Sequence, residues 1–210
     1  MNWRSIFTIT KKDIKEASQN KSVWLPMLVV PTIFIIILPV AMVLAVTAAA
    51  DSAQVLTSDP DLVNFFERMP EAMKAVTAGL TPNQSGIVLV MGYLFAPFFL
   101  IMPLMYSTVI AAESFAGERE RKTIEALLYT PASDTEMFLG KVLASFIPAV
   151  AITIGSFLVY ILVLNGVSFQ VMGRIWFPLP SWYPLIFWVS PAISLLGVCA
   201  TVLISSKAQT

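Results

Sequence analysis

The sequence contains no histidine and a single cysteine in its 210 residues. Without histidine it lacks the commonest general base, the commonest metal ligand and the usual activator of a serine or cysteine nucleophile. Cys199 has no second cysteine with which to form a disulfide inside the chain. Composition therefore disfavours an intramembrane enzyme, because such sites use histidines for metal or general-base work.

Charge is scarce as well. Charged residues make up 12% of the chain against 57% hydrophobic residues, and the mean hydropathy is +0.79. A soluble globule of this size needs more polar surface than that, so the chain is predicted to be an integral membrane protein. The net charge is zero and the basic residues are not pooled in one tract, so nucleic acid is not expected as a partner.

Four apolar runs, each free of Asp, Glu, Lys and Arg, are long enough to cross a bilayer as helices. These runs are 23–46, 87–112, 142–164 and 183–205. They predict an all-α fold, a polytopic transmembrane helical bundle in a single domain, 1–210. Prolines inside the runs imply neighbouring helices that satisfy the freed carbonyls. An ion-coupled secondary transporter would be expected to place carboxylates inside its spans, and these spans have none.

Residues 1–22 have the period of an amphipathic helix. One face carries Trp3, Ile6, Phe7, Thr10, Ile14 and Ala17, and the other carries Arg4, Lys11, Lys12, Lys15 and Gln19. This pattern predicts a helix that lies in the plane of the membrane interface. Its basic side fits either anionic headgroups or a partner protein, and we favour the headgroups.

The distribution of basic residues predicts the orientation of the spans. With the N-terminus inside, ten of the 13 lysines and arginines lie on the cytoplasmic side. The outer side holds the other three, Arg68, Lys74 and Arg174. Segments 1–22, 113–141 and 206–210 are therefore expected to be cytoplasmic, and 47–86 and 165–182 to be extracytoplasmic loops.

The segment 113–141 is too polar to lie in lipid. Five consecutive charges run from Glu118 to Lys122, and Ile124, Leu127 and Leu128 then recur at the spacing of one helix face. Thr130-Pro131 ends the pattern, because the residue before proline is pushed out of the α region. This pattern is typical of a charged loop that leads into a short amphipathic helix. A solvated loop between two spans is the simpler alternative.

The same segment resembles the most recognisable part of the type 2 family of ABC-transporter permeases. Residues 116–131, AGERERKTIEALLYTP, fit the family's A-G-E-R-E-x-G-T-x-E-x-L-L-x-T-P, and Leu139-Gly140-Lys141 fits the Leu-Gly-Lys that opens the third span. Lys122 departs from the glycine that the family usually has at that position. The large outer loop is most similar to those of the sodium-efflux and drug-efflux permeases.

The resemblance implies the permease subunit of an ATP-driven exporter, which forms the translocation path in the plasma membrane of a prokaryote. Its cargo would be sodium or a drug-like small molecule. A second permease copy or a paralogue would complete a dimer, and a separate ABC ATPase subunit would hold ATP and magnesium, leaving no cofactor on this chain. The helix from Thr123 to Tyr129 would be the cytoplasmic coupling helix. Its implied ATPase contacts are Glu118, Glu120, Thr123, Ile124, Glu125, Leu127 and Leu128.

The residues agree with this division of labour. The sequence has no G-x-x-x-x-G-K-[ST] run: Gly140-Lys141 is followed by Val142, and Thr135 stands where the first glycine would be. The family usually has six spans and this chain has four, so we expect a form truncated after its fourth span. A membrane anchor or assembly factor without transport activity is the alternative, and it would need no coupling helix.

Overall fold

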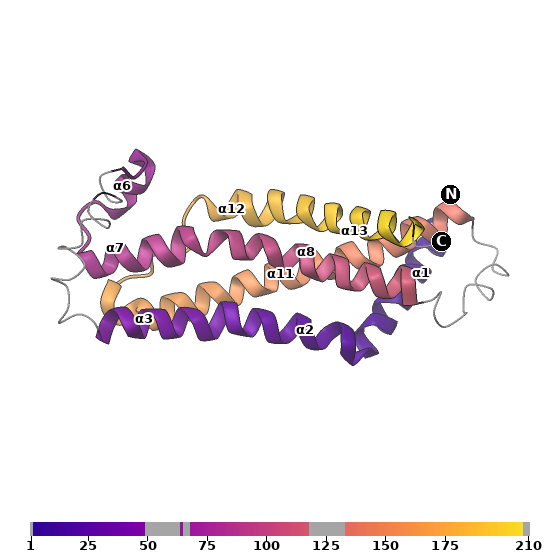
Figure 1. Cartoon of the computed structure of the whole chain (residues 1–210), viewed down its shortest axis with the longest axis horizontal. Helices are drawn as coiled ribbons and strands as arrows, with labels where there is room; N and C mark the ends of the chain where they lie inside the picture. Colours follow the sequence, from indigo (N-terminus) through magenta and orange to yellow (C-terminus); the bar gives the residue numbers. More distant parts are fainter. Residues whose placement is uncertain (1, 49–63, 65–67, 118–132, 208–210) are drawn as a thin grey trace. The chain divides into compact units, whose positions relative to one another are not determined.

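A computed structural model describes residues 2–48, 64, 68–117 and 133–207, and every regular element in these ranges is a helix. Elements labelled η are π-helical turns. In chain order the elements are α1 (Trp3–Gln19), α2 (Lys21–Pro31), η1 (Thr32–Ile37), α3 (Leu38–Ala48), α6 (Glu71–Thr77), α7 (Pro82–Leu89), η3 (Val90–Leu94), α8 (Ala96–Ala112), η4 (Glu113–Gly117), α11 (Asp134–Met172), α12 (Trp182–Pro184), η5 (Leu185–Val189) and α13 (Ser190–Lys207) (Figure 1).

Four continuous helical stretches are long and apolar enough to cross a membrane. They are Val23–Ala45, Pro82–Phe115, Asp134–Met172 and Trp182–Ser205. The predicted all-α, polytopic bundle is therefore confirmed. The longest stretch, α11, has 39 residues. At 1.5 Å per residue it is about 58 Å long, roughly twice the thickness of the hydrocarbon layer, so its ends extend well beyond its apolar middle.

Prolines follow three of the π-helical turns in these stretches, η1, η3 and η5. Pro39, Pro97 and Pro191 each follow a π turn within two or three residues. Proline donates no hydrogen bond, and its ring clashes with the carbonyl four residues earlier. In the turn before Pro97 the ladder is widened, because Phe95 donates its N–H to Val90 O at 3.0 Å, five residues back. The prolines thus change the helical ladder locally without ending the helix.

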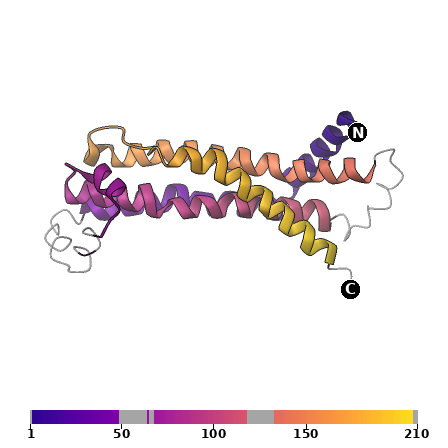
Figure 2. The same ribbon diagram turned by 90° about the horizontal axis from the view of Figure 1, so that it is seen from above.

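The described chain divides into two compact units. The first contains Met1–Pro31, Phe98–Phe157 and Tyr183–Thr210, and the second contains Thr32–Pro97 and Leu158–Trp182. In the first unit α8 and α13 approach closely at Gly197, where an added Cβ would overlap the Ser107 hydroxyl. Small residues at a helix crossing allow such an approach. Figure 2 shows α1, also in this unit, running obliquely to the first half of α11.

An aromatic cluster forms the core of the second unit. Tyr160 and Trp182 are 0% and 1% exposed, and their ring centroids are 5.5 Å apart. The Tyr160 hydroxyl donates to Met91 O at 2.8 Å, and Trp182 Nε1 donates to Gly92 O at 2.7 Å. Both acceptors belong to the π turn η3, where the ladder is shifted. Two aromatic donors therefore satisfy backbone carbonyls that water cannot reach.

A short turn closes this cluster. Asn165 Oδ1 accepts the backbone N–H groups of Trp176 and Phe177, and its Nδ2 donates to Phe177 O at 2.8 Å. Phe177 and Trp182 lie inside the unit, each 1% exposed, and both rings pack on Tyr160, whereas Tyr183 is 50% exposed.

Removing the Tyr160 hydroxyl tests the role of this donor. Tyr160→Phe keeps the ring but leaves Met91 O without its donor, so we expect a loss of roughly 1–2 kcal/mol in stability. Thermal unfolding in detergent measures the effect. Tyr183→Phe, at an exposed ring, is the matched control and should leave the transition within experimental error. Equal transitions for the two variants would show that the bond does not stabilise the unit.

Candidate functional site

The predicted ATPase contacts lie outside the described residues. Glu118, Glu120, Thr123, Ile124, Glu125, Leu127 and Leu128 all belong to the range 118–132. The structure does describe the chain on both sides of that range, which is η4 before it and the start of α11 after it. Both belong to the first unit, and both contact α1. This junction is the candidate site.

Helix α1 contacts the rest of the first unit along a narrow stripe. Ile6, Thr10, Asp13 and Ala17 are its buried residues, at the i, i+4, i+7, i+11 spacing of one helix face. The predicted helix is present, but its predicted apolar face is divided. Trp3 and Phe7 are 57% and 58% exposed, with their ring centroids 6.3 Å apart, and Ile14 is half-buried.

Glu136 joins the starts of two helices. Its side chain and the Ser133 side chain form a reciprocal capping pair at the start of α11: Ser133 N donates to Glu136 Oε2 at 3.3 Å, and Glu136 N donates to Ser133 Oγ at 3.4 Å. The other carboxylate oxygen accepts the backbone N–H of Asn2 at 2.5 Å. Asn2 is the N-cap of α1. One carboxylate therefore accepts orphan donors from both helix starts, where negative charge is stabilising.

Gly140 is where α1 crosses α11. A Cβ at this position would lie 2.8 Å from Ile9 Cγ2 and 3.3 Å from the Ile6 carbonyl oxygen. The buried Thr10 hydroxyl lies 2.9 Å from Ile6 O and 3.0 Å from Gly140 O, and its single hydrogen is shared between these two carbonyl acceptors. The glycine of the Leu139-Gly140-Lys141 motif thus has a structural reason: any side chain would push α1 away.

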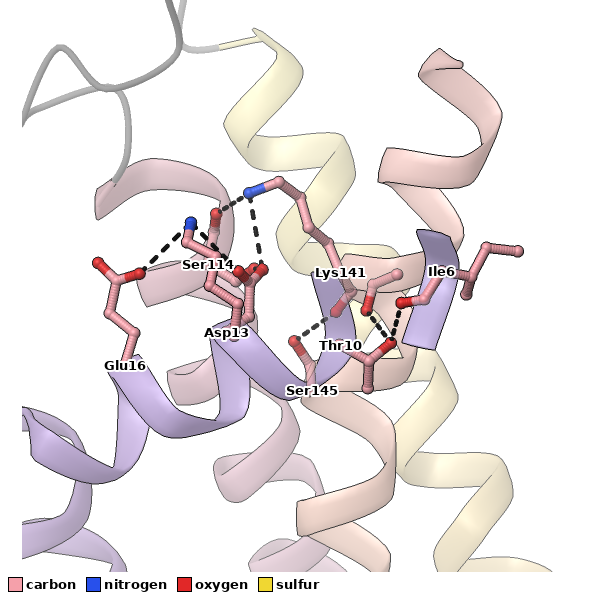
Figure 3. Close-up of polar contacts among 9 residues, drawn as sticks. Ile6, Thr10, Asp13, Glu16, Ser114, Lys141 and Ser145 are labelled. Atoms are coloured by element: carbon pink, nitrogen blue, oxygen red, sulfur yellow. Dashed lines mark hydrogen bonds and ion pairs between the residues drawn. The ribbon is translucent and has the colours of Figure 1, made fainter. Parts of the chain in front are cut away.

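The lysine of the same motif enters a buried polar cluster with Asp13 and Ser114. Ser114 Oγ donates to Asp13 Oδ2 at 2.7 Å, and Lys141 Nζ donates to Ser114 O at 2.6 Å (Figure 3). Lys141 Nζ also lies 3.9 Å from Asp13 Oδ2, where the two side chains are 11% and 5% exposed. We call Asp13, Ser114 and Lys141 the junction cluster.

Further charge and ring contacts surround the cluster. Lys12 Nζ is 3.5 Å from Asp13 Oδ1 and 3.5 Å from Glu16 Oε2. The ammonium of Lys141 lies 5.5 Å from the Phe115 ring centroid, within the range of a cation–π contact. Two cations thus compensate the buried Asp13 carboxylate, as a charge removed from water requires.

The junction cluster connects three chain segments through two hydrogen bonds and an ion pair. Within the described ranges, no group of three His, Cys, Asp or Glu side chains is placed to hold a metal ion. Asp13 and Ser114 are not among the residues predicted from the sequence, and Lys141 is there only as part of a motif. A signal for Asp13 was present, because the spacing 6, 10, 13, 17 places it among residues that a helix would bury.

Gly140→Ala tests whether close approach at this crossing docks α1. We expect the added methyl group to cost about 1.4 kcal/mol, which raises the undocked population of α1 about tenfold. Trypsin cleavage at Lys11, Lys12 and Lys15, followed by mass spectrometry, reports that population.

Gly155→Ala is the matched control on the same helix. Among the described residues no atom lies within 4 Å of a Cβ at Gly155, so cleavage in α1 should keep its original rate. If Gly140→Ala is cleaved no faster than Gly155→Ala, the close approach does not hold α1 in place.

Comparison with known proteins identifies the family. The family model described as ABC-2 family transporter protein matches residues 7–210, which include most of α1 and every later helix. No curated protein and no solved structure gives a significant match. The resemblance read from residues 116–131 and 139–141 is therefore confirmed. With four membrane-spanning stretches inside or overlapping the match, the chain is a multi-pass membrane subunit of a transporter and belongs to the ABC-2 transporter family.

Proposed function

We propose that this chain is the permease subunit of an ATP-driven exporter, and that a separate ATPase subunit drives it. The observation that carries the proposal is the family match over residues 7–210, which includes the charged segment with its AGERERKTIEALLYTP run. The absence of a G-x-x-x-x-G-K-[ST] run supports a second chain for the ATP and magnesium.

The coupling contact is assigned to the apolar stripe of residues 123–129. Ile124, Leu127 and Leu128 would fill a groove on the ATPase, as in helix-in-groove recognition. Glu118, Glu120 and Glu125 would face water or basic residues of the partner. The junction supports this assignment, because α1, η4 and α11 meet at the two ends of the segment and give it a fixed base.

The translocation path is proposed to form with a second copy of this chain or a paralogue. The apolar runs contain no acidic or basic residue, so a sodium ion would meet hydroxyl and carbonyl oxygens there, not carboxylates. A drug-like small molecule is the other cargo class.

Helix α1 is proposed to lie at the cytoplasmic interface. Its buried stripe is occupied by the protein, and the exposed Trp3 and Phe7 rings lie beside that stripe. Lys11 and Lys15 are exposed on the adjoining face. Aromatic rings next to lysines are typical of a helix with its rings in the headgroup layer and its lysines against anionic lipid.

The proposed orientation is tested by cysteine labelling in a Cys199→Ser background, because Cys199 is exposed. Ile175 is 76% exposed in the turn between α11 and α12, so Ile175→Cys should react with an impermeant reagent added to intact cells. Thr135→Cys, exposed at the start of α11, should react after the cells are opened. Labelling of Thr135→Cys in intact cells would reverse the assigned orientation.

The coupling role is tested by capture of the ATPase subunit in detergent. Leu127→Asp should place an unpaired charge in the docking groove, at a cost of several kcal/mol, and abolish capture while membrane insertion stays intact. Charge reversal at Glu118 and Glu120 is the comparison, with a smaller loss, because solvated ion pairs contribute about 0–1 kcal/mol each. Capture by Leu127→Asp at the original level would refute the coupling role. No capture by the unmodified chain would favour the membrane anchor or assembly factor.

A further inference from the structure

One buried carboxylate contacts both sides of the charged segment. Ser114 precedes the range 118–132 and Lys141 follows it, and Asp13 of α1 contacts both side chains. Ser114 and Lys141 also contact each other, across 27 positions of sequence. The three side chains therefore form a closed set of contacts among the end of the second span, the start of α11 and α1 (Figure 3).

Each contact satisfies a group that would otherwise be costly to bury. Ser114 lies in η4, and its buried backbone carbonyl accepts a hydrogen bond from Lys141 Nζ at 2.6 Å. The same ammonium group is a counter-charge for the buried carboxylate of Asp13.

The junction cluster lies among several carboxylates, so it needs the positive charge of Lys141. A crevice beside the cluster is lined by Asp13, Glu16, Ala17, Glu113 and Ser114, which brings three acidic residues together. Lys12 lies beside Asp13 and Glu16 on the exposed side, and Lys141 supplies positive charge from the buried side. Removing either Asp13 or Lys141 leaves the other charge buried beside an incomplete set of partners, which is strongly destabilising for a buried pair.

We propose that Asp13 is a positioning residue: it holds the end of the second span and the start of α11 at a fixed separation and ties both to α1. A displacement at either end of the charged segment then moves α1. Helix α1 in turn passes the displacement to the membrane interface. This last step rests on the proposed function, whereas the fixed separation does not. The buried contacts of Asp13 carry the inference.

Distance measurement between spin labels tests the fixed separation without any partner protein. In the Cys199→Ser background, labels at Ala112→Cys and Thr135→Cys lie at exposed positions on the two sides of the cluster. The full chain in nanodiscs should give a single narrow distance. Asp13→Asn and Lys141→Met should lose that narrow distance, and Lys141→Arg, which keeps a cation and its donors, should retain it.

Two controls separate positioning from general loss of structure. Labels at Leu104→Cys and Leu196→Cys report the packing of α8 on α13 in the same unit, and their distance should not change in Asp13→Asn. Lys15→Gln removes an exposed charge from α1 and should leave both distances unchanged. An unchanged Ala112–Thr135 distance in Asp13→Asn overturns the proposal. Broadening of both distances does so as well, because Asp13 would then stabilise the whole unit.

A second arm joins the inference to the proposed function. With the ATPase subunit bound, a non-hydrolysable ATP analogue should shift the distance between labels at Thr8→Cys and Leu196→Cys, and Asp13→Asn should lose this shift while it still captures the ATPase. An equal shift in Asp13→Asn would refute transmission through Asp13. If the unmodified chain captures no ATPase, the proposed function fails, and the first arm still decides the positioning role.

Discussion

A backbone carbonyl released from its helical ladder inside a membrane protein must find a donor within the protein, because lipid offers none. The second unit meets this requirement with side chains from a distant part of the sequence. Tyr160 and Trp182 donate to the carbonyls of Met91 and Gly92 in η3. The π turn before Pro97 is tolerated because tertiary packing places these two donors beside it.

The same requirement applies to charge. Asp13 is buried on α1, and the Ser114 hydroxyl together with two lysines compensates its carboxylate. Hydrophobic residues of similar volume would often give equal or greater stability at a buried ion pair. A charged group at this place therefore contributes geometry more than stability, because its bonds have directions and fix which three segments meet.

The sequence was sufficient for the large features and not for the contacts. Apolar runs of more than twenty residues fixed the four spans, and the spacing of Ile6, Thr10 and Ala17 fixed a helix at the N-terminus. The donors to η3 were not predictable from the sequence, because they depend on how the helices pack. Tyr160 is 69 positions from its acceptor and Trp182 is 90 positions from its own. The helical spacing places Asp13 among the residues that α1 buries, but its charge alone predicts an exposed side chain. Its burial is explained only by its partners, Ser114 and Lys141. The roles assigned to Leu127 and its neighbours stay predictions, since these residues lie outside the described ranges.

The crossing at Gly140 also sets an order of events during synthesis. Thr10 and Gly140 are 130 residues apart, so the ribosome has finished α1 long before the surface on which it docks exists. At about 5–20 residues per second the interval is roughly 7–26 seconds. Asp13 waits 101 residues for Ser114 and longer for Lys141, and until then the amphipathic helix is free to rest on the bilayer surface. Docking of α1 therefore cannot precede the synthesis of the start of α11.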